Sequence, residues 1–151
     1  MGCLEELVER GLVRRRRFSE PVRSVAEASR VAGVEAGGIV KTLVWVVDGR
    51  FVAVIVRGDC RVNVERLRRE LGAVEARPAS REEVSRATGY PVGGVPPVCL
   101  EGVDLVVVDR GVLVNDVVVG GGGDERSLVW VRVSTLLDLV RPLLAEVADC
   151  G

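Results

Sequence analysis

Residues 39–57 read IVKTLVWVVDGRFVAVIVR, and this stretch decides the fold class. Two runs rich in β-branched residues, 39–47 and 51–57, flank the dipeptide Asp48-Gly49. Branched side chains fit a pleated surface, and Asp-Gly accepts the positive φ angles of a tight turn. The stretch therefore predicts a β-hairpin. Because both runs are apolar at most positions, at least one of the two strands should be largely buried.

Helices and further strands are expected on both sides of this hairpin, from apolar spacing and from capping residues. The predicted helices are 3–10, 22–32, 64–71 with Asn63 as N-cap, one that starts at a Ser80–Glu83 capping box, and one that starts at Ser134 as N-cap. The predicted strands are 104–108, 112–114, 116–119 and 128–133, with an edge strand at 12–18 and a glycine loop at 120–123. This order lacks a regular βαβ alternation, so it predicts an α+β fold with a mixed sheet.

Length and composition fit one folded unit, and we expect residues 1–151 to form a single domain. Hydrophobic residues make up 48% of the chain and charged residues 28%, which is typical of a globular protein. No apolar run reaches the roughly eighteen residues that a membrane span needs. The first ten residues carry three glutamates and no apolar signal core, so the sequence predicts a cytoplasmic protein.

Cysteine and histidine usage excludes several kinds of site. The four cysteines, at positions 3, 60, 99 and 150, are widely spaced, and the chain has no histidine. A Cys/His zinc site, a Cys-His nucleophile and a Ser-His-Asp triad are therefore unavailable. We expect four ordinary thiols, some of them in the core, rather than a metal site, and no cofactor; the sequence leaves open whether any of the cysteines form a disulfide.

Charge singles out one residue. The formal net charge is −1, so there is no global attraction to nucleic acid, although Arg14–Arg17 and Arg66–Arg69 are local basic clusters. Of 21 cationic side chains 20 are arginine, and Lys41 is the only lysine. It lies within an apolar strand, on the face of Ile39 and Leu43. Either its stem packs while its ammonium reaches water, or it lines a cleft and donates to a substrate.

Two glycine-rich segments are further candidates. Residues 89–97, GYPVGGVPP, contain three prolines and three glycines and cannot form regular structure. Such a loop is either a rigid connection or a backbone surface that approaches a ligand closely. The run 120–123 matches no nucleotide-binding pattern, so a hairpin tip is the simpler interpretation. No side chain stands out as a nucleophile, and a hydrolase built on this chain would act by positioning and polarisation.

Three segments together resemble the YbaK/ProX family of prolyl-tRNA synthetase-associated editing deacylases. They are VKTLVWVVDGRFVAVIV at 40–56, NVERLRRELGA at 63–73 and ATGYPVGGVPP at 87–97. The runs VVVDRGVL at 106–113 and VVVGGGG at 117–123 are similar to the closing half of the family. The resemblance covers about residues 22–149. It implies an α+β domain with a partly barrel-like mixed sheet flanked by helices.

The resemblance also implies an activity and a site. The activity is hydrolysis of the ester between a wrong amino acid, alanine or cysteine, and a proline tRNA. Lys41 matches the essential lysine of the family, and Gly93 and Pro97 match the ends of its G-x-x-x-P loop. Thr42, Gly94 and Val95 would line the same pocket, Gly121 and Gly122 match a closing glycine pair, and Phe18 is the candidate for a nearby aromatic residue. Pro96 and Gly120 depart from the family pattern, so the amino acid removed stays open.

The implied partners are the aminoacylated 3′ end of a tRNA and, as helpers, prolyl-tRNA synthetase or an elongation factor. Two other classes of function remain open on the residues alone. Because no conventional catalytic group is present, the chain could be a non-catalytic module that binds tRNA or a synthetase. The net charge of −1 also permits a structural or inhibitor-like domain with no role in nucleic-acid binding.

Overall fold

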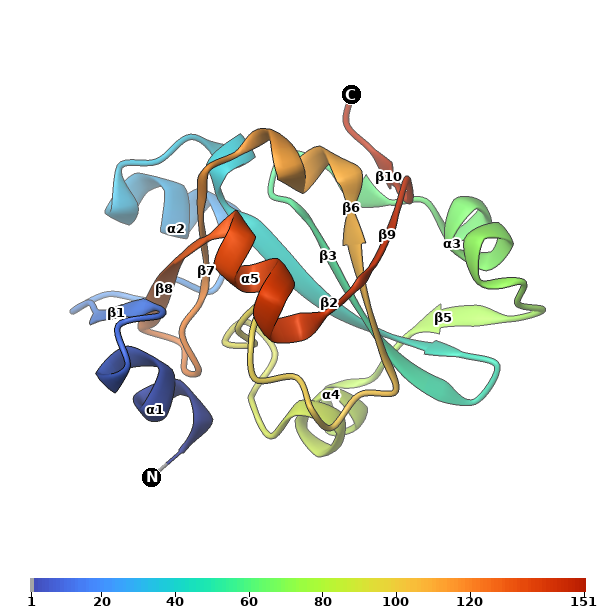
Figure 1. The fold of residues 1–151 in the computed structure, drawn as a ribbon, viewed down its shortest axis with the longest axis horizontal. Helices are drawn as coiled ribbons and strands as arrows, with labels where there is room; N and C mark the ends of the chain where they lie inside the picture. Colours follow the sequence, from blue (N-terminus) through green and yellow to red (C-terminus); the bar gives the residue numbers. More distant parts are fainter. Residues whose placement is uncertain (1) are drawn as a thin grey trace.

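The computed structural model of the chain describes residues 2–151 (Figure 1). The helices are α1 (Cys3–Glu9), α2 (Val25–Ala32), the 3₁₀ helix η1 (Ala36–Gly38), α3 (Val64–Leu71), α4 (Arg81–Thr88), the 3₁₀ helix η2 (Arg110–Val114) and α5 (Val133–Val140). The strands are β1 (Arg14–Arg17), β2 (Val40–Val47), β3 (Arg50–Arg57), β4 (Arg61–Val62), β5 (Ala76–Pro78), β6 (Leu105–Asp109), β7 (Val117–Gly121), β8 (Ser127–Arg132), β9 (Leu143–Ala145) and β10 (Ala148–Asp149).

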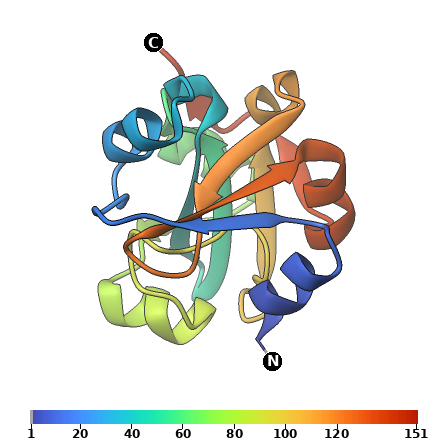
Figure 2. The same ribbon diagram turned by 90° about the vertical axis from the view of Figure 1, so that its left-hand side faces the viewer.

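The predicted α+β class with mixed pairing is confirmed. A five-stranded sheet has the order β5-β2-β3-β6-β9, antiparallel between β5, β2 and β3 and parallel between β3, β6 and β9. A three-stranded antiparallel sheet, β1-β8-β7, lies across one end, and β4 pairs with β10. A single bridge between Ile39 and Val119 joins the two larger sheets. No closed barrel forms among these strands. Figure 2 looks onto the three-stranded sheet, with the larger sheet behind it.

The central hairpin forms as predicted. Asp48 and Gly49 both have positive φ angles, 47° and 80°, which fits the turn expected from their residue types. The alternation of β2 then sorts its side chains between two cores. Val40 and Val44 face the larger core, which α1, α4, α5 and the three-stranded sheet cover, whereas Trp45 and Val47 face the smaller core under α3.

A third apolar cluster holds α2 against the three-stranded sheet. Ala28 of α2 packs with Ile39, with Val119 of β7 and with Leu128 of β8, and all four are at most 3% exposed. The helix begins at a capping box, in which the Ser24 hydroxyl accepts from the Glu27 amide and the Glu27 carboxylate accepts from the Ser24 amide. This cluster therefore fixes the N-terminus of α2 beside the start of β2.

Three sequence predictions in the second half are wrong in detail. Residues 112–114 were expected as a strand but belong to η2, because the Asp109 carboxylate accepts from the Gly111 amide at 2.9 Å and starts a 3₁₀ turn. Gly120 and Gly121 were expected in a loop but complete β7. Ser134 was expected as an N-cap, but the cap position is two residues earlier, at Arg132, without a side-chain cap, and α5 begins at Val133.

Candidate active site

A cavity of about 260 Å³ opens where the start of β2 meets the N-terminus of α2, the 92–95 loop and β7. Its walls are mostly apolar, and its polar groups gather on β2 and just before α2. The lining residues are Val22, Arg23, Ser24, Val25, Ala28, Ile39, Val40, Lys41, Thr42, Leu43, Val92, Gly93, Val95, Gly120, Gly121 and Leu128. A mostly apolar pocket with a few convergent polar groups is the arrangement typical of a small-molecule site.

Lys41 borders this cavity and a second, more polar one of about 540 Å³ on the other side of β2. Its ammonium donates a hydrogen bond to the carbonyl oxygen of Cys60. Burial lowers the pKa of Lys41 below its ordinary value; the positive charge of Arg61 lowers it further, and Asp59 opposes both. A desolvated ammonium held by a carbonyl is a positioned donor, and shifts of this kind gather at functional sites.

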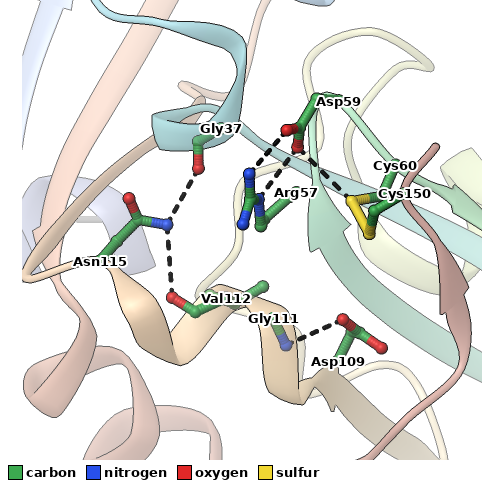
Figure 3. Close-up of polar contacts among 9 residues, drawn as sticks. All are labelled: Gly37, Arg57, Asp59, Cys60, Asp109, Gly111, Val112, Asn115 and Cys150. Atoms are coloured by element: carbon green, nitrogen blue, oxygen red, sulfur yellow. Dashed lines mark hydrogen bonds and ion pairs between the residues drawn. A yellow bond between two sulfur atoms is a disulfide. The ribbon is translucent and has the colours of Figure 1, made fainter.

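The loop that holds Lys41 is itself fixed by an ion pair and a disulfide (Figure 3). Arg57 donates to both carboxylate oxygens of Asp59, over 3.0 Å from Nε and 2.6 Å from Nη2. The hydrogen bond from Arg57 keeps the pKa of Asp59 below its usual range. Next to it, Cys60 is bonded to Cys150. The Cys60 carbonyl, which accepts the hydrogen bond from Lys41, therefore lies in a segment fixed by the Arg57–Asp59 ion pair and by the disulfide to Cys150.

The expectation of four ordinary thiols is wrong. Cys3 pairs with Cys99 and Cys60 pairs with Cys150, across sequence separations of 96 and 90 residues. The spacing of the cysteines gave no sign of this pairing, because connectivity depends on the fold rather than on position in the chain. Disulfides are uncommon in the cytosol of mesophiles, and the cytoplasmic location stays a prediction.

Thr42 contributes an unusual polar atom. Its side chain lines the cavity from the face of β2 opposite to that of Lys41, and its Oγ1 atom is buried with no hydrogen-bond partner among residues 2–151. A buried hydroxyl without a partner costs about 1–3 kcal/mol of stability. A buried polar atom without a partner, in a residue that borders a cavity, marks a candidate functional position.

The 92–97 loop covers the cavity by packing backbone against backbone. The Gly94 amide donates to the Pro91 carbonyl at 2.9 Å, and the Gly94 carbonyl accepts from the Gly123 amide at 2.8 Å. Gly93 has a φ of 88°, in the region that favours glycine. The Pro97 ring packs on Gly120, where an added Cβ would lie only 2.9 Å from the ring. The loop is thus a rigid wall of the cavity.

Five of the eight predicted site residues line this cavity: Lys41, Thr42, Gly93, Val95 and Gly121. The other three do not line it. Gly94 and Pro97 are buried in the loop behind the wall, and Gly122 joins the hairpin between β7 and β8, where its amide donates to the Ser127 carbonyl at 2.9 Å. Phe18 packs against Trp130 outside the cavity, with ring centroids 6.4 Å apart.

Sequence reasoning missed the wall that precedes and begins α2. Val22, Arg23, Ser24 and Ala28 line the cavity, and Leu128 reaches it from β8. The Ser24–Glu27 spacing was an available signal, because a capping box marks a helix N-terminus. That signal would have placed the start of the helix correctly, but it could not have shown that this end meets β2.

Replacing Gly121 with alanine should destabilise the fold by about 1–3 kcal/mol, because an added Cβ would lie 2.5 Å from the Val95 carbonyl oxygen and 3.0 Å from the Gly94 carbonyl carbon. Both contacts are backbone, so the loop must move away from β7. Urea unfolding would measure the change. Val117→Ala is the matched control, because it removes an exposed side chain of the same strand. Equal stability of the two variants would contradict this account of the loop.

Two properties of the described residues bear on the class of site. Residues 2–151 contain no group of three or more His, Cys, Asp or Glu side chains arranged to hold a metal ion. Within the same range, no helix is both long and apolar enough to cross a membrane. The polar residues that line the cavity are Arg23, Ser24, Lys41 and Thr42.

Solved structures of other proteins share this architecture. The crystal structure of a hypothetical protein superposes with a TM-score of 0.87 and 39% sequence identity, covering 96% of this chain and 97% of that one. A candidate trans-editing enzyme for prolyl tRNA synthetase gives a TM-score of 0.83 and 28% identity over 99% of each chain. The fold is therefore that of an editing domain.

Sequence comparison gives the family. The model of the aminoacyl-tRNA editing domain matches residues 19–139, and the chain belongs to this family. The proline–tRNA ligase of Geobacter metallireducens is 38% identical over 129 residues, which are 84% of this chain and 22% of the ligase. That of Caldicellulosiruptor bescii is 31% identical over 135 residues, 87% of this chain and 23% of the ligase. The chain thus spans about a fifth of these relatives. The resemblance seen in the sequence is confirmed.

Proposed function

We propose that this domain hydrolyses the ester bond of a mischarged aminoacyl-tRNA, with alanine or cysteine on a proline tRNA as its client. The observation that carries the proposal is one small, mostly apolar cavity that both Lys41 and Thr42 border. The choice of a proline tRNA as the substrate rests on the relatives. The matching curated proteins are proline–tRNA ligases, and a similar structure is a candidate editing enzyme for prolyl tRNA synthetase.

The walls of the cavity fit a small side chain. Val22, Ala28, Ile39 and Leu128 make an apolar surface, and each is at most 3% exposed. A pocket of this kind admits the side chain of alanine or cysteine and excludes large ones by shape. Synthetases discriminate poorly between small amino acids by binding alone, and a second site that hydrolyses the wrong ester corrects the error.

The reaction needs an attacking oxygen and a group that stabilises negative charge. Among the cavity residues there is no histidine, aspartate or glutamate, so a water molecule or a hydroxyl of the substrate would attack the ester carbonyl. In attack by water, the C–O bond to the ribose breaks, the free amino acid leaves, and the proton from the water ends on the ribose oxygen. Lys41 would stabilise the developing oxyanion, and Thr42 would orient the ester.

A panel of charged tRNAs tests the proposal. Proline tRNA charged with alanine, cysteine, serine or proline is incubated with the protein, and loss of the ester is followed over time. We expect one non-cognate ester to disappear and the prolyl ester to persist. Binding of charged tRNA without any ester loss would overturn the proposal and would favour a non-catalytic binding module.

Replacing Thr42 with valine should raise stability by about 1 kcal/mol and slow ester loss about tenfold. Valine keeps the shape of the side chain but removes the buried oxygen that has no partner. Thermal unfolding and single-turnover kinetics measure the two effects. Thr88→Val is the control with the opposite sign, because the Thr88 hydroxyl donates to the Val84 carbonyl and accepts from the Tyr90 amide. A less stable Thr42→Val protein with full turnover would contradict the role of Thr42.

A further inference from the structure

The four arginines of β1 are divided by the alternation of the strand. Arg15 and Arg17 point to one side, where both reach the Asp124 carboxylate, at 3.0 Å and 3.3 Å. Arg15 also donates to the Gly122 carbonyl at 2.7 Å. These two side chains hold the hairpin between β7 and β8 against β1. Their charge is partly neutralised by Asp124, so they have a structural role.

Arg14 and Arg16 point to the other side and stack on aromatic rings. The Arg14 guanidinium carbon lies 4.8 Å from the centroid of Trp130, and that of Arg16 lies 5.1 Å from Phe18. The structure of residues 2–151 shows no ion pair for either side chain, and both residues are exposed. Arg14, Arg16, Phe18 and Trp130 form what we call the arginine platform: two cations in fixed positions with free donors.

The arginine platform lies on the same face of the sheet as the cavity. In the antiparallel register Arg14 is opposite Trp130 and Arg16 is opposite Leu128. Side chains of directly opposite residues share a face, and Leu128 is a wall of the cavity. Phe18 and Trp130 also pack against the apolar cluster that holds α2 beside that cavity. The platform therefore shares a face of the β1–β8 pair with Leu128, a residue of the cavity wall. The strand β1 is the blue strand that crosses the front of Figure 2.

The other arginine cluster of the sequence is different. Arg66 donates to the Ala148 carbonyl and pairs with Asp149, and Arg68 pairs with Glu65. Both belong to α3, which lies at the opposite end of the molecule from β1 (Figure 1). Of the two basic clusters, only that of β1 combines free cations with proximity to the cavity.

We propose that the arginine platform binds the RNA strand next to the 3′-terminal nucleotide whose ester occupies the cavity. This inference rests on the proposed function. Guanidinium groups donate in pairs to phosphate oxygens, and their planes, like aromatic rings, stack on bases. Stacking on Trp130 and Phe18 orders the two side chains before binding, which reduces the entropy lost when RNA binds. The arginine platform would thus supply affinity for RNA in a domain whose net charge is −1.

The test compares two double variants with the same change in charge. Arg14→Gln/Arg16→Gln removes the arginine platform, and Arg50→Gln/Arg69→Gln removes two exposed arginines, from β3 and α3, far from it. Binding of uncharged proline tRNA is measured at several salt concentrations, independently of any ester loss. We expect the first variant alone to bind about tenfold more weakly, with a salt slope shallower by about 1.5, as for two lost phosphate contacts.

Kinetics give a second readout. On charged tRNA the platform variant should raise KM and leave kcat unchanged, whereas an aminoacyl ester of adenosine without the RNA chain should be hydrolysed at the wild-type rate. Equal weakening in both double variants, no weakening in either, or no tRNA binding by the wild type at low salt would overturn the inference. Failure of ester hydrolysis with an intact, platform-dependent tRNA affinity would instead overturn the proposed function alone.

Discussion

Replacing Lys41 with alanine should slow ester hydrolysis by about 10²–10³-fold, the loss that follows removal of one positioned donor to an oxyanion. The ammonium is partly buried, its pKa is lowered first by burial, and it donates to the Cys60 carbonyl, while the residue itself borders the cavity. No other lysine exists in the chain, and Arg23 is the only other cation at the cavity. Single-turnover hydrolysis of the preferred ester measures the loss.

The stability of the Lys41→Ala protein should change little. Because the pKa of Lys41 is lowered on folding, the charged form is disfavoured in the folded state, and this cost is present at neutral pH. Losing the charge therefore offsets the loss of the hydrogen bond to Cys60. Lys41→Arg is the matched control, since it keeps the charge but presents a planar fork instead of a compact ammonium, and it should also be slow. Full turnover in either variant would exclude the role assigned to Lys41.

Replacing Asp109 with alanine should destabilise the fold by about 3–5 kcal/mol, the largest effect that we expect on stability. The carboxylate is 5% exposed and accepts from three backbone amides: Val147 at 2.8 Å, Ala148 at 3.1 Å and Gly111 at 2.9 Å (Figure 3 shows the last). Alanine would leave these donors buried without an acceptor. Urea unfolding under oxidising conditions, which keep both disulfides, measures the difference.

Two other variants sharpen this test. Asp109→Asn keeps one acceptor oxygen but turns an NH₂ group toward a donor, so an intermediate loss is expected. Asp104→Ala removes a carboxylate that accepts from the Phe51 amide at an exposed position, and it should cost less than Asp109→Ala. If Asp109→Ala lowered the free energy of unfolding no more than Asp104→Ala does, the proposed contribution of the buried Asp109 carboxylate to stability would be contradicted.

Local chemistry made much of the fold predictable from the sequence. The Asp48-Gly49 turn, the Asn63 cap and the Ser80–Glu83 capping box depend on residues that are neighbours in the chain, and each forms as expected. Predictions failed where a distant segment decided the outcome. Gly120 and Gly121 resemble a loop by composition, yet they extend β7 because the 93–97 loop packs where side chains would otherwise lie.

The site was predictable in part for the same reason. Lys41 stood out because it is the only lysine and lies in an apolar strand, and Gly93 and Gly121 stood out through the family resemblance; all three lie at the cavity. The unpartnered oxygen of Thr42 and the wall formed by α2 depend on how three distant segments meet. The disulfide beside Lys41 depends on where the C-terminal strand ends. No pattern within one segment contains that information.

The two disulfides have a consequence for cleavage of the backbone. One covalent loop runs from Cys3 to Cys99 and the other from Cys60 to Cys150, so the loops overlap and together enclose residues 3–150. A single cut at any peptide bond in that range falls inside at least one loop. The two fragments would therefore stay joined as one molecule until a reductant separates them. A protease that nicks an exposed turn of the oxidised protein would open the chain without releasing any part of it.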